Sequence, residues 1–446
     1  LPKMSGSIGF QAARDRVSMD GEIRKARWLF DGIADYRAGN TVHQLSDVFM
    51  SGLAMFSLKY HSLLDFDQQT IIERENLKQV FGIESISSDT NLRTVLDKCD
   101  NTVLRDCFAG RFKDLQRTGL LKDYEYGIAD NKYLIVSCDG VQHFSSKQIS
   151  CPCCLEKKHK DGSVTYHHNM LCSALVNPNK REVFIIANEP IVQQDGTTKN
   201  DCELNAAKRL YQQLDENYAS YKQRYNFLVV EDALYANAPH LRQLQDVGYS
   251  FIINVKPDSH KSLFAHIEGR RSRKQIKTHT VHQDGCTHRF EWVNDIPLNN
   301  TDGALRINFL HYQQTNSKGK TTTFTWVTDI KITAKRCYAI MRAARARWKI
   351  ENETFNTLKN LGYHFEHNYG HGKDHLSTTL AYLMLLAFHI DQFVQACSRV
   401  FKALEAHLKT KIKLWATIKS IFQTTYAKSM DFIYRRVAIL FQIQLE

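Results

Sequence analysis

Five short apolar runs, with two stretches of helical periodicity among them, constrain the fold of this chain more than any other feature. The first three, YLIVSCDG, NMLCSALVNP and EVFIIANEP, follow one another from Tyr133 with turn residues between them, which predicts an antiparallel meander. An amphipathic helix over about 201–218 precedes the fourth run, NFLVVED, and a helix over about 239–246 precedes the fifth, YSFIINVKP. This order predicts an α/β fold with a mixed sheet flanked by helices.

The same patterns divide the chain into five regions. Residues 1–130 show mainly helical spacing, and residues 131–257 hold the first part of the sheet. Residues 258–332 become basic and then alternate, as in HRFEWV and TTTFTWVTDI, which predicts a β-rich insertion. Residues 333–375 begin with strong helix formers and predict a long helix that completes the core. Residues 376–446 place apolar and basic residues at helical spacing and predict further helices.

Two carboxylates follow buried strands. Asp139 comes directly after YLIVSC, and Asp232 comes directly after FLVVE. The element order is that of a ribonuclease-H-like fold, in which these two strands are neighbours, so we expect the carboxylates to converge at one edge of the sheet. They would repel each other unless cations lay between them, and carboxylate oxygens are ligands that suit Mg²⁺. A cluster of this kind supports two-metal phosphoryl chemistry.

Glu351 is the candidate third acid. It lies in RARWKIENETFNTLKN, next to the most basic segment of the chain, since residues 335–349 hold six Lys or Arg and no acid. Arg347 precedes Glu351 by one helical turn, so both side chains project from one face, where a guanidinium could hold a phosphate. The alternative is an ordinary surface ion pair worth about a few tenths of a kcal/mol.

Several segments in this order resemble the DDE transposases of bacterial insertion sequences, in particular the IS4-related group. The resemblance rests on SCDGVQHF, VVEDALYANAP and RWKIENETFNTLKN, and extends to SISSDTNLRTVLD, KNDCELNAAKRL, WVTDIKI and EHNYGHGKDHLSTTLAYLMLLAFHIDQ. It covers roughly residues 80–395. It implies that Asp139, Asp232 and Glu351 are the catalytic metal ligands, that Mg²⁺ is the cofactor, and that Mn²⁺ can substitute.

The resemblance also implies DNA contacts for Arg347 and Lys359, with two departures from the tyrosine, arginine, glutamate, lysine signature of the group. Ala344 stands at the tyrosine position, and Lys359 lies eight rather than seven residues after Glu351. A π-bulge in the helix would absorb the extra residue and return Lys359 to the face of Glu351. Glu353 is the rival third acid, but it points roughly opposite in a regular helix.

Clustered positive charge favours a nucleic-acid partner. The net charge is +12, and residues 256–277 hold seven Lys or Arg against two acids. We expect DNA contacts from these side chains and from the helix before Glu351: Arg270, Arg271, Arg273, Lys274 and Arg345. Trp292 and Trp326 could stack on an unpaired base, although core packing is the commoner fate of a tryptophan.

Cysteines and histidines leave a second metal question open. Cys151 and Cys154, with a later His or Cys, could bind a structural Zn²⁺, but the irregular spacing favours a thiol-rich turn between strands. His367, His371 and His375 are expected to bond DNA phosphate or the active-site carboxylates rather than a metal.

Eleven cysteines without a secretion signal fit a reducing bacterial cytoplasm, where the protein would associate with the nucleoid. The apolar run at 380–390 is too short to cross a bilayer, so no membrane partner is expected.

The expected function is metal-dependent cleavage at transposon ends, followed by strand transfer into target DNA. The partners would be double-stranded DNA and, because two ends must be joined, a second copy of the chain in a homodimer. The helical region 1–130 would recognise DNA ends or form the dimer. The alternatives are a domesticated DNA-binding protein without catalysis, a ribonuclease on the same fold and a zinc-dependent regulator.

Overall fold

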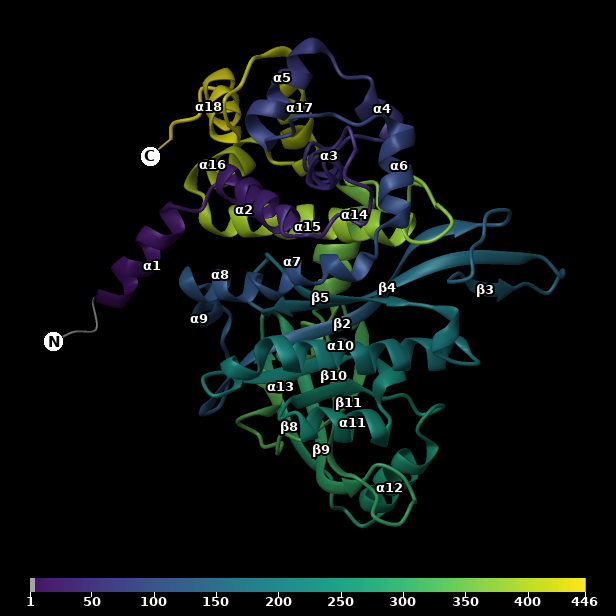
Figure 1. Cartoon of the computed structure of the whole chain (residues 1–446). Helices are drawn as coiled ribbons and strands as arrows, with labels where there is room; N and C mark the ends of the chain where they lie inside the picture. The colour runs from purple at the N-terminus through teal and green to yellow at the C-terminus, as the bar shows by residue number, and fades with distance from the viewer. Residues whose placement is uncertain (1–4, 446) are drawn as a thin grey trace.

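The computed structural model describes residues 5–445, and a mixed sheet runs through the middle of this part of the molecule (Figure 1). The strand order is β3-β4-β2-β6-β7-β11-β10-β9-β8, with β1 paired to β2 and β5 paired to β4. The strands are β1 (Tyr126–Ile128), β2 (Asn131–Ser146), β3 (Leu155–Lys158), β4 (Val164–Val176), β5 (Phe184–Ile191), β6 (Asn226–Glu231), β7 (Ser250–Asn254), β8 (Lys277–Gln283), β9 (Cys286–Pro297), β10 (Arg306–Thr315) and β11 (Thr321–Thr328).

The core of the sheet has the predicted topology. β2, β4 and β5 form an antiparallel meander, and β6 and β7 add in parallel on the other side of β2. The helix α10 (Lys199–Lys222) leads into β6, and α11 (Ala238–Asp246) leads into β7. Leu228, Val229 and Val230 of β6 have no exposed surface, as expected of a parallel strand covered on both faces. The fold is therefore the expected ribonuclease-H-like mixed sheet with flanking helices.

The β-rich insertion continues the main sheet. β11 pairs with β7 through Val327 and Ile253, and β10, β9 and β8 follow as an antiparallel series. Trp292 and Trp326 are 4% and 2% exposed, so they pack in the core and are not available to stack on a base. The basic segment before β8 begins within a helix, α12 (Lys261–Ser272), rather than in an extended strand.

The N-terminal and C-terminal helices pack against each other on one side of the sheet (Figure 1). From the N-terminal part come α1 (Ser5–Asp15), α2 (Met19–Asp31), α3 (Leu45–Ser57), α4 (Leu63–Asp67), α5 (Ile71–Phe81), α6 (Asp89–Lys98), η1 (Asn101–Leu104), α7 (Asp106–Ala109), α8 (Arg111–Arg117) and α9 (Leu120–Tyr124). From the C-terminal part come α15 (Leu376–Cys397), α16 (Arg399–Leu408), α17 (Lys411–Thr424) and α18 (Met430–Leu440). Within residues 5–445, the N-terminal and C-terminal regions are both mainly helical, as predicted.

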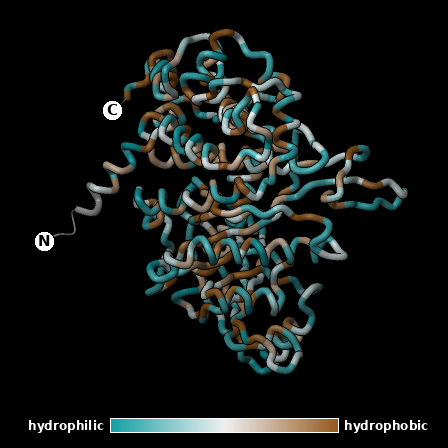
Figure 2. The backbone as a smooth tube through the Cα atoms, viewed as in Figure 1, coloured by the Kyte–Doolittle hydropathy of each residue, from teal (hydrophilic) through white to brown (hydrophobic). Residues whose placement is uncertain are grey.

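The helix α15 is the centre of this packing. It has 22 residues and, alone among the described helices, is long and apolar enough to cross a membrane by length and composition, so the expectation of a run too short for this, drawn from residues 380–390, is wrong. However, 94% of its most apolar window is buried inside the protein, as in the core helix of a globular fold. Its Asp391 pairs with the buried Lys59 near the end of α3, at 2.7 Å. In Figure 2 hydrophobic stretches likewise recur through the interior, among the strands and the helices against them.

Asp97 at the end of α6 fixes the start of α15. Its carboxylate accepts hydrogen bonds from the backbone N–H groups of Lys373, Asp374, His375 and Leu376 at 2.8–3.0 Å. Burial acts to raise the pKa of Asp97, but these four donors outweigh it and leave the pKa lowered. The N-terminal region thereby holds the loop that leads into α15.

We predict that Asp97→Ala lowers the free energy of unfolding by about 2–3 kcal/mol, because several backbone donors lose their acceptor in a partly buried place. Thermal unfolding followed by circular dichroism measures the change. The stability of Asp97→Asn should lie between those of the parent and Asp97→Ala. Glu75 is exposed, so Glu75→Ala serves as a control. An Asp97→Ala protein that unfolds at the same temperature as the parent would contradict the role of this carboxylate.

Candidate active site at the ends of two parallel strands

The parallel pairing of β2 with β6 brings the first two candidate acids together. Ser137 is the register partner of Val230, so the same register carried two residues further places Asp139 beside Asp232. Asp139 Oδ1 accepts a hydrogen bond from the backbone of Gly140, and Asp232 Oδ1 accepts one from the backbone of Leu234, both at 2.9 Å. Both side chains are partly exposed at the rim of the sheet.

The third acid comes from an interrupted helix that lies on β2. The helix α13 (Cys337–Arg345) ends in a turn, the π-helix η4 (Ile350–Phe355) follows, and α14 (Asn356–Asn360) completes the segment. Buried Ser137 donates a hydrogen bond to the carbonyl of Arg347 at 3.0 Å, and the backbone N–H of Ile350 donates to the same carbonyl at 3.2 Å. Ser137 and Asp139 are two residues apart on a strand, so both face this helix.

Arg347 joins the first and third acids. Its Nη1 lies 2.7 Å from Glu351 Oε1 and 3.2 Å from Asp139 Oδ2, and its side chain is only 10% exposed. Burial raises the pKa of Asp139 to about 7; Arg347 opposes this rise, whereas Glu351 and Asp232 add to it. The site thus gathers negative charge that one guanidinium does not neutralise.

The π-helix that the eight-residue spacing predicted is present, at Ile350–Phe355. Burial lowers the pKa of Lys349 and of Lys411, and the charge of Glu353 opposes that effect at both lysines. Lys359 pairs with Glu366 at 2.7 Å, and among the described residues it forms no ion pair with Glu351.

The other predicted DNA contacts lie outside this cluster. Arg345 donates to Gln314 at 2.9 Å and stacks near the rings of Phe324 and Trp348. Arg271 pairs with Glu291 at 2.9 Å. The remaining side chains lie at the end of α12, where Arg270 bonds Gln275 and where Arg273 and Lys274 are exposed.

Glu203 of α10 is a fourth acid that the sequence did not single out. It accepts a hydrogen bond from Tyr235 at 3.1 Å. Burial raises its pKa, the bond from Tyr235 opposes the rise, and the charge of Asp232 adds to it. A side chain at Gly140 would touch its carboxylate. The only signal was its place in KNDCELNAAKRL, which carried part of the resemblance.

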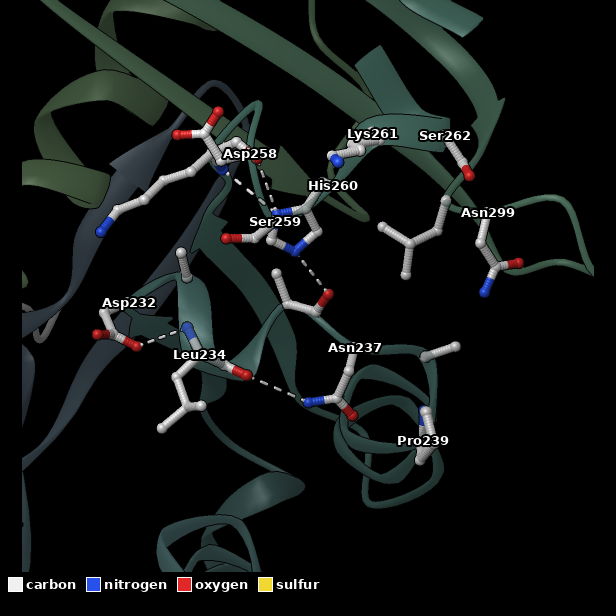
Figure 3. Close-up of a pocket in the computed structure, with 15 residues that line it drawn as sticks. Asp232, Leu234, Asn237, Pro239, Asp258, Ser259, His260, Lys261, Ser262 and Asn299 are labelled. Atoms are coloured by element: carbon white, nitrogen blue, oxygen red, sulfur yellow. Dashed lines mark hydrogen bonds between the residues drawn. The ribbon is translucent and has the colours of Figure 1, made fainter. Parts of the chain in front are cut away.

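An open pocket of about 810 Å³ begins at Asp232 (Figure 3). Its wall includes Lys256 and Lys261, which offer positive charge, and His260, whose Nε2 lies 3.1 Å from the carbonyl oxygen of Ala236. The pocket therefore extends the acidic rim toward the basic end of the insertion.

A ribonuclease-H-like sheet with acids at the ends of two adjacent central strands defines the class of enzyme that transfers phosphoryl groups in nucleic acids. Residues 143–388 match the family model described as transposase DDE domain. This is more than half of the 446 residues, and the chain belongs to this family of transposases. The matched range includes Asp232 and Glu351 and begins just after Asp139. No curated protein matches the chain.

The raised pKa of Asp139 predicts that, in the absence of divalent cations, this group makes the folded protein less stable as the pH rises. The unfolded chain ionises Asp139 near 3.8 and the folded chain near 7, so the contribution of this group to stability falls as the pH rises between these values. We expect Asp139→Asn to be more stable than the parent, by about 1–2 kcal/mol at pH 8, and by less at pH 5. Denaturant unfolding in Mg²⁺-free buffer measures the difference.

The exposed Asp130, in the turn before β2, provides the matched control, and Asp130→Asn should show no such dependence. The interpretation fails if the advantage of Asp139→Asn is the same at both pH values or is reversed at pH 8.

Proposed function

We propose that this transposase cleaves DNA at the ends of an IS4-related insertion sequence and joins the freed ends to target DNA. The observation that carries the proposal is that Asp139 lies beside Asp232 in the parallel register and that Arg347 joins Asp139 to Glu351. Water attacks the phosphorus at the transposon end, the bond to the 3′-oxygen breaks, and a 3′-hydroxyl is left. That hydroxyl then attacks a target phosphate and displaces its 3′-oxygen.

The donor set fits Mg²⁺, with Mn²⁺ as a substitute. Asp139, Asp232 and Glu351 supply only carboxylate oxygens, which are the ligands that these ions prefer. Burial raises the pKa of Asp139 and the charges of Glu351 and Asp232 add to the rise, and a divalent cation at this rim would offset both effects. When bound, the ions would supply Lewis-acid activation of the attacking and leaving oxygens.

The chain's own residues would hold and orient the DNA. Arg347 pairs with two carboxylates in this structure. Once cations neutralise those carboxylates, its guanidinium could bind a phosphate in bidentate fashion. The exposed Arg273 and Lys274, with Lys256 and Lys261 of the pocket beside Asp232, support a backbone track toward the insertion. Arg270, Arg271, Arg345 and Lys359 would have to exchange their present partners for phosphates.

We also propose that the transposase acts as a homodimer, since two transposon ends must meet in one complex. It would work on nucleoid DNA in the bacterial cytoplasm, and its eleven free cysteines support a reducing compartment.

The test is cleavage of a duplex that carries the end of the element. Asp139→Asn, Asp232→Asn and Glu351→Gln should each lower the cleavage rate in Mg²⁺ by about 100-fold or more, because each removes an anionic metal ligand from the reacting centre. Mn²⁺ should support cleavage by the parent. Glu353→Gln is the matched control on the same helix and should retain cleavage within about threefold.

Binding to the duplex, measured in Ca²⁺, should persist in all four variants. If Glu353→Gln loses cleavage and Glu351→Gln keeps it, the third acid is wrong. A parent that binds the end but never cuts it indicates a DNA-binding protein without catalysis. Faster hydrolysis of RNA than of the DNA end indicates a ribonuclease.

A further inference from the structure

Four soft ligand side chains meet in one place outside the carboxylate cluster. Cys151 and Cys154 come from the loop between β2 and β3, His168 comes from β4, and His371 comes from the loop between α14 and α15. One ligand atom from each lies within 4.8 Å of all the others. Three of the four side chains are buried, and Cys151 is half-buried.

The distances are those of a tetrahedral zinc site. The two sulfurs are 3.7 Å apart, and the two Nε2 atoms are 3.1 Å apart. Three of the four sulfur-to-nitrogen distances are 3.3–3.4 Å. Ligands about 2.3 Å (sulfur) and about 2.0–2.1 Å (nitrogen) from a tetrahedral Zn²⁺ lie about 3.3–3.8 Å from one another. All six distances between the ligand atoms are at most 4.8 Å, so small side-chain adjustments would let the four atoms bind one ion.

Hydrogen bonding alone does not account for this arrangement. Nδ1 of His371 lies 2.7 Å from the carbonyl oxygen of Gly372, which can only accept, so Nδ1 carries the proton and Nε2 presents a lone pair. That lone pair points into a group of two sulfurs and another ring nitrogen. A carbonyl that fixes the outer nitrogen of the imidazole is also the usual support of a metal-bound histidine.

The local backbone supports the cysteines as ligands. The N–H of Cys151 donates to Sγ of Cys154 at 3.4 Å, and the N–H of Cys154 donates to the carbonyl of Cys151 at 3.1 Å. The two thiols therefore sit on one tight turn, and a backbone donor stabilises negative charge on one sulfur. Cys153, between them, makes no such bond among the described residues.

We propose that Cys151, Cys154, His168 and His371 bind one structural Zn²⁺. Four protein ligands leave no open position for water or substrate, so the ion would have no direct part in DNA cleavage. It would tie the loop that follows Asp139 to the loop that follows Glu351. The thiol-rich-turn interpretation and the assignment of His371 to the active site are both replaced by this proposal.

The experiment measures the zinc content of the purified full-length protein by inductively coupled plasma mass spectrometry. The parent should hold close to one zinc per chain, and Cys151→Ser, Cys154→Ser and His371→Asn should each lose most of it. Cys153→Ser and His367→Ala are the matched controls and should keep it. Asp139→Asn should keep it as well, which separates this site from the proposed catalytic one and from the fate of that proposal.

Two measurements on the parent remain informative if a ligand variant fails to fold. Titration with a mercurial reagent should release the zinc as thiols react, and reconstitution with Co²⁺ should give the intense visible bands of a tetrahedral site with thiolate ligands. Parent protein that contains little zinc and shows no such Co²⁺ spectrum would overturn the proposal, as would equal zinc loss from Cys153→Ser.

Discussion

The pairing of β2 with β6 is the constraint on which the candidate active site depends. Parallel register sets Asp139 beside Asp232, and the buried strands leave these carboxylates little freedom to move apart. Burial favours the neutral form of Asp139, the guanidinium of Arg347 opposes this effect, and the charges of Glu351 and Asp232 add to it. The hydrophobic packing of the sheet thus holds in place an electrostatic arrangement that is unfavourable by itself and suited to binding cations.

The local part of this arrangement could be predicted from the sequence. Buried parallel strands are continuous apolar runs, so Asp139 and Asp232 were recognisable at their ends. The spacing between Glu351 and Lys359 predicted a π-helix because an extra residue must be absorbed somewhere in the helix. The spacing did not predict the partner of Lys359, since Glu366 lies beyond the helix on a turn whose path no periodicity specifies.

Contacts between residues far apart in the sequence could not be predicted from local patterns, for physical reasons. The extent of α15 was underestimated because polar residues such as Asp391 seemed to end the apolar run, yet Asp391 is buried where Lys59 neutralises it. The metal-ligating side chains of Cys154 and His371 are distant in sequence, and only the folded chain shows that their ligand atoms lie 3.3 Å apart. Pairing of this kind depends on tertiary packing and leaves no local signature.

The segment that carries Glu351 has contacts with other parts of the fold both before and after its π-helix. Before it, Ser137 of β2 donates a hydrogen bond to the carbonyl of Arg347. After it, Asp97 and the cluster around His371 hold the loop that leads to α15. The π-helix accommodates the extra residue by widening one turn, and the widened turn contains Glu351. Glu351 pairs with Arg347, which in turn pairs with Asp139 of β2, so the position of this carboxylate depends on contacts between the helix and the sheet.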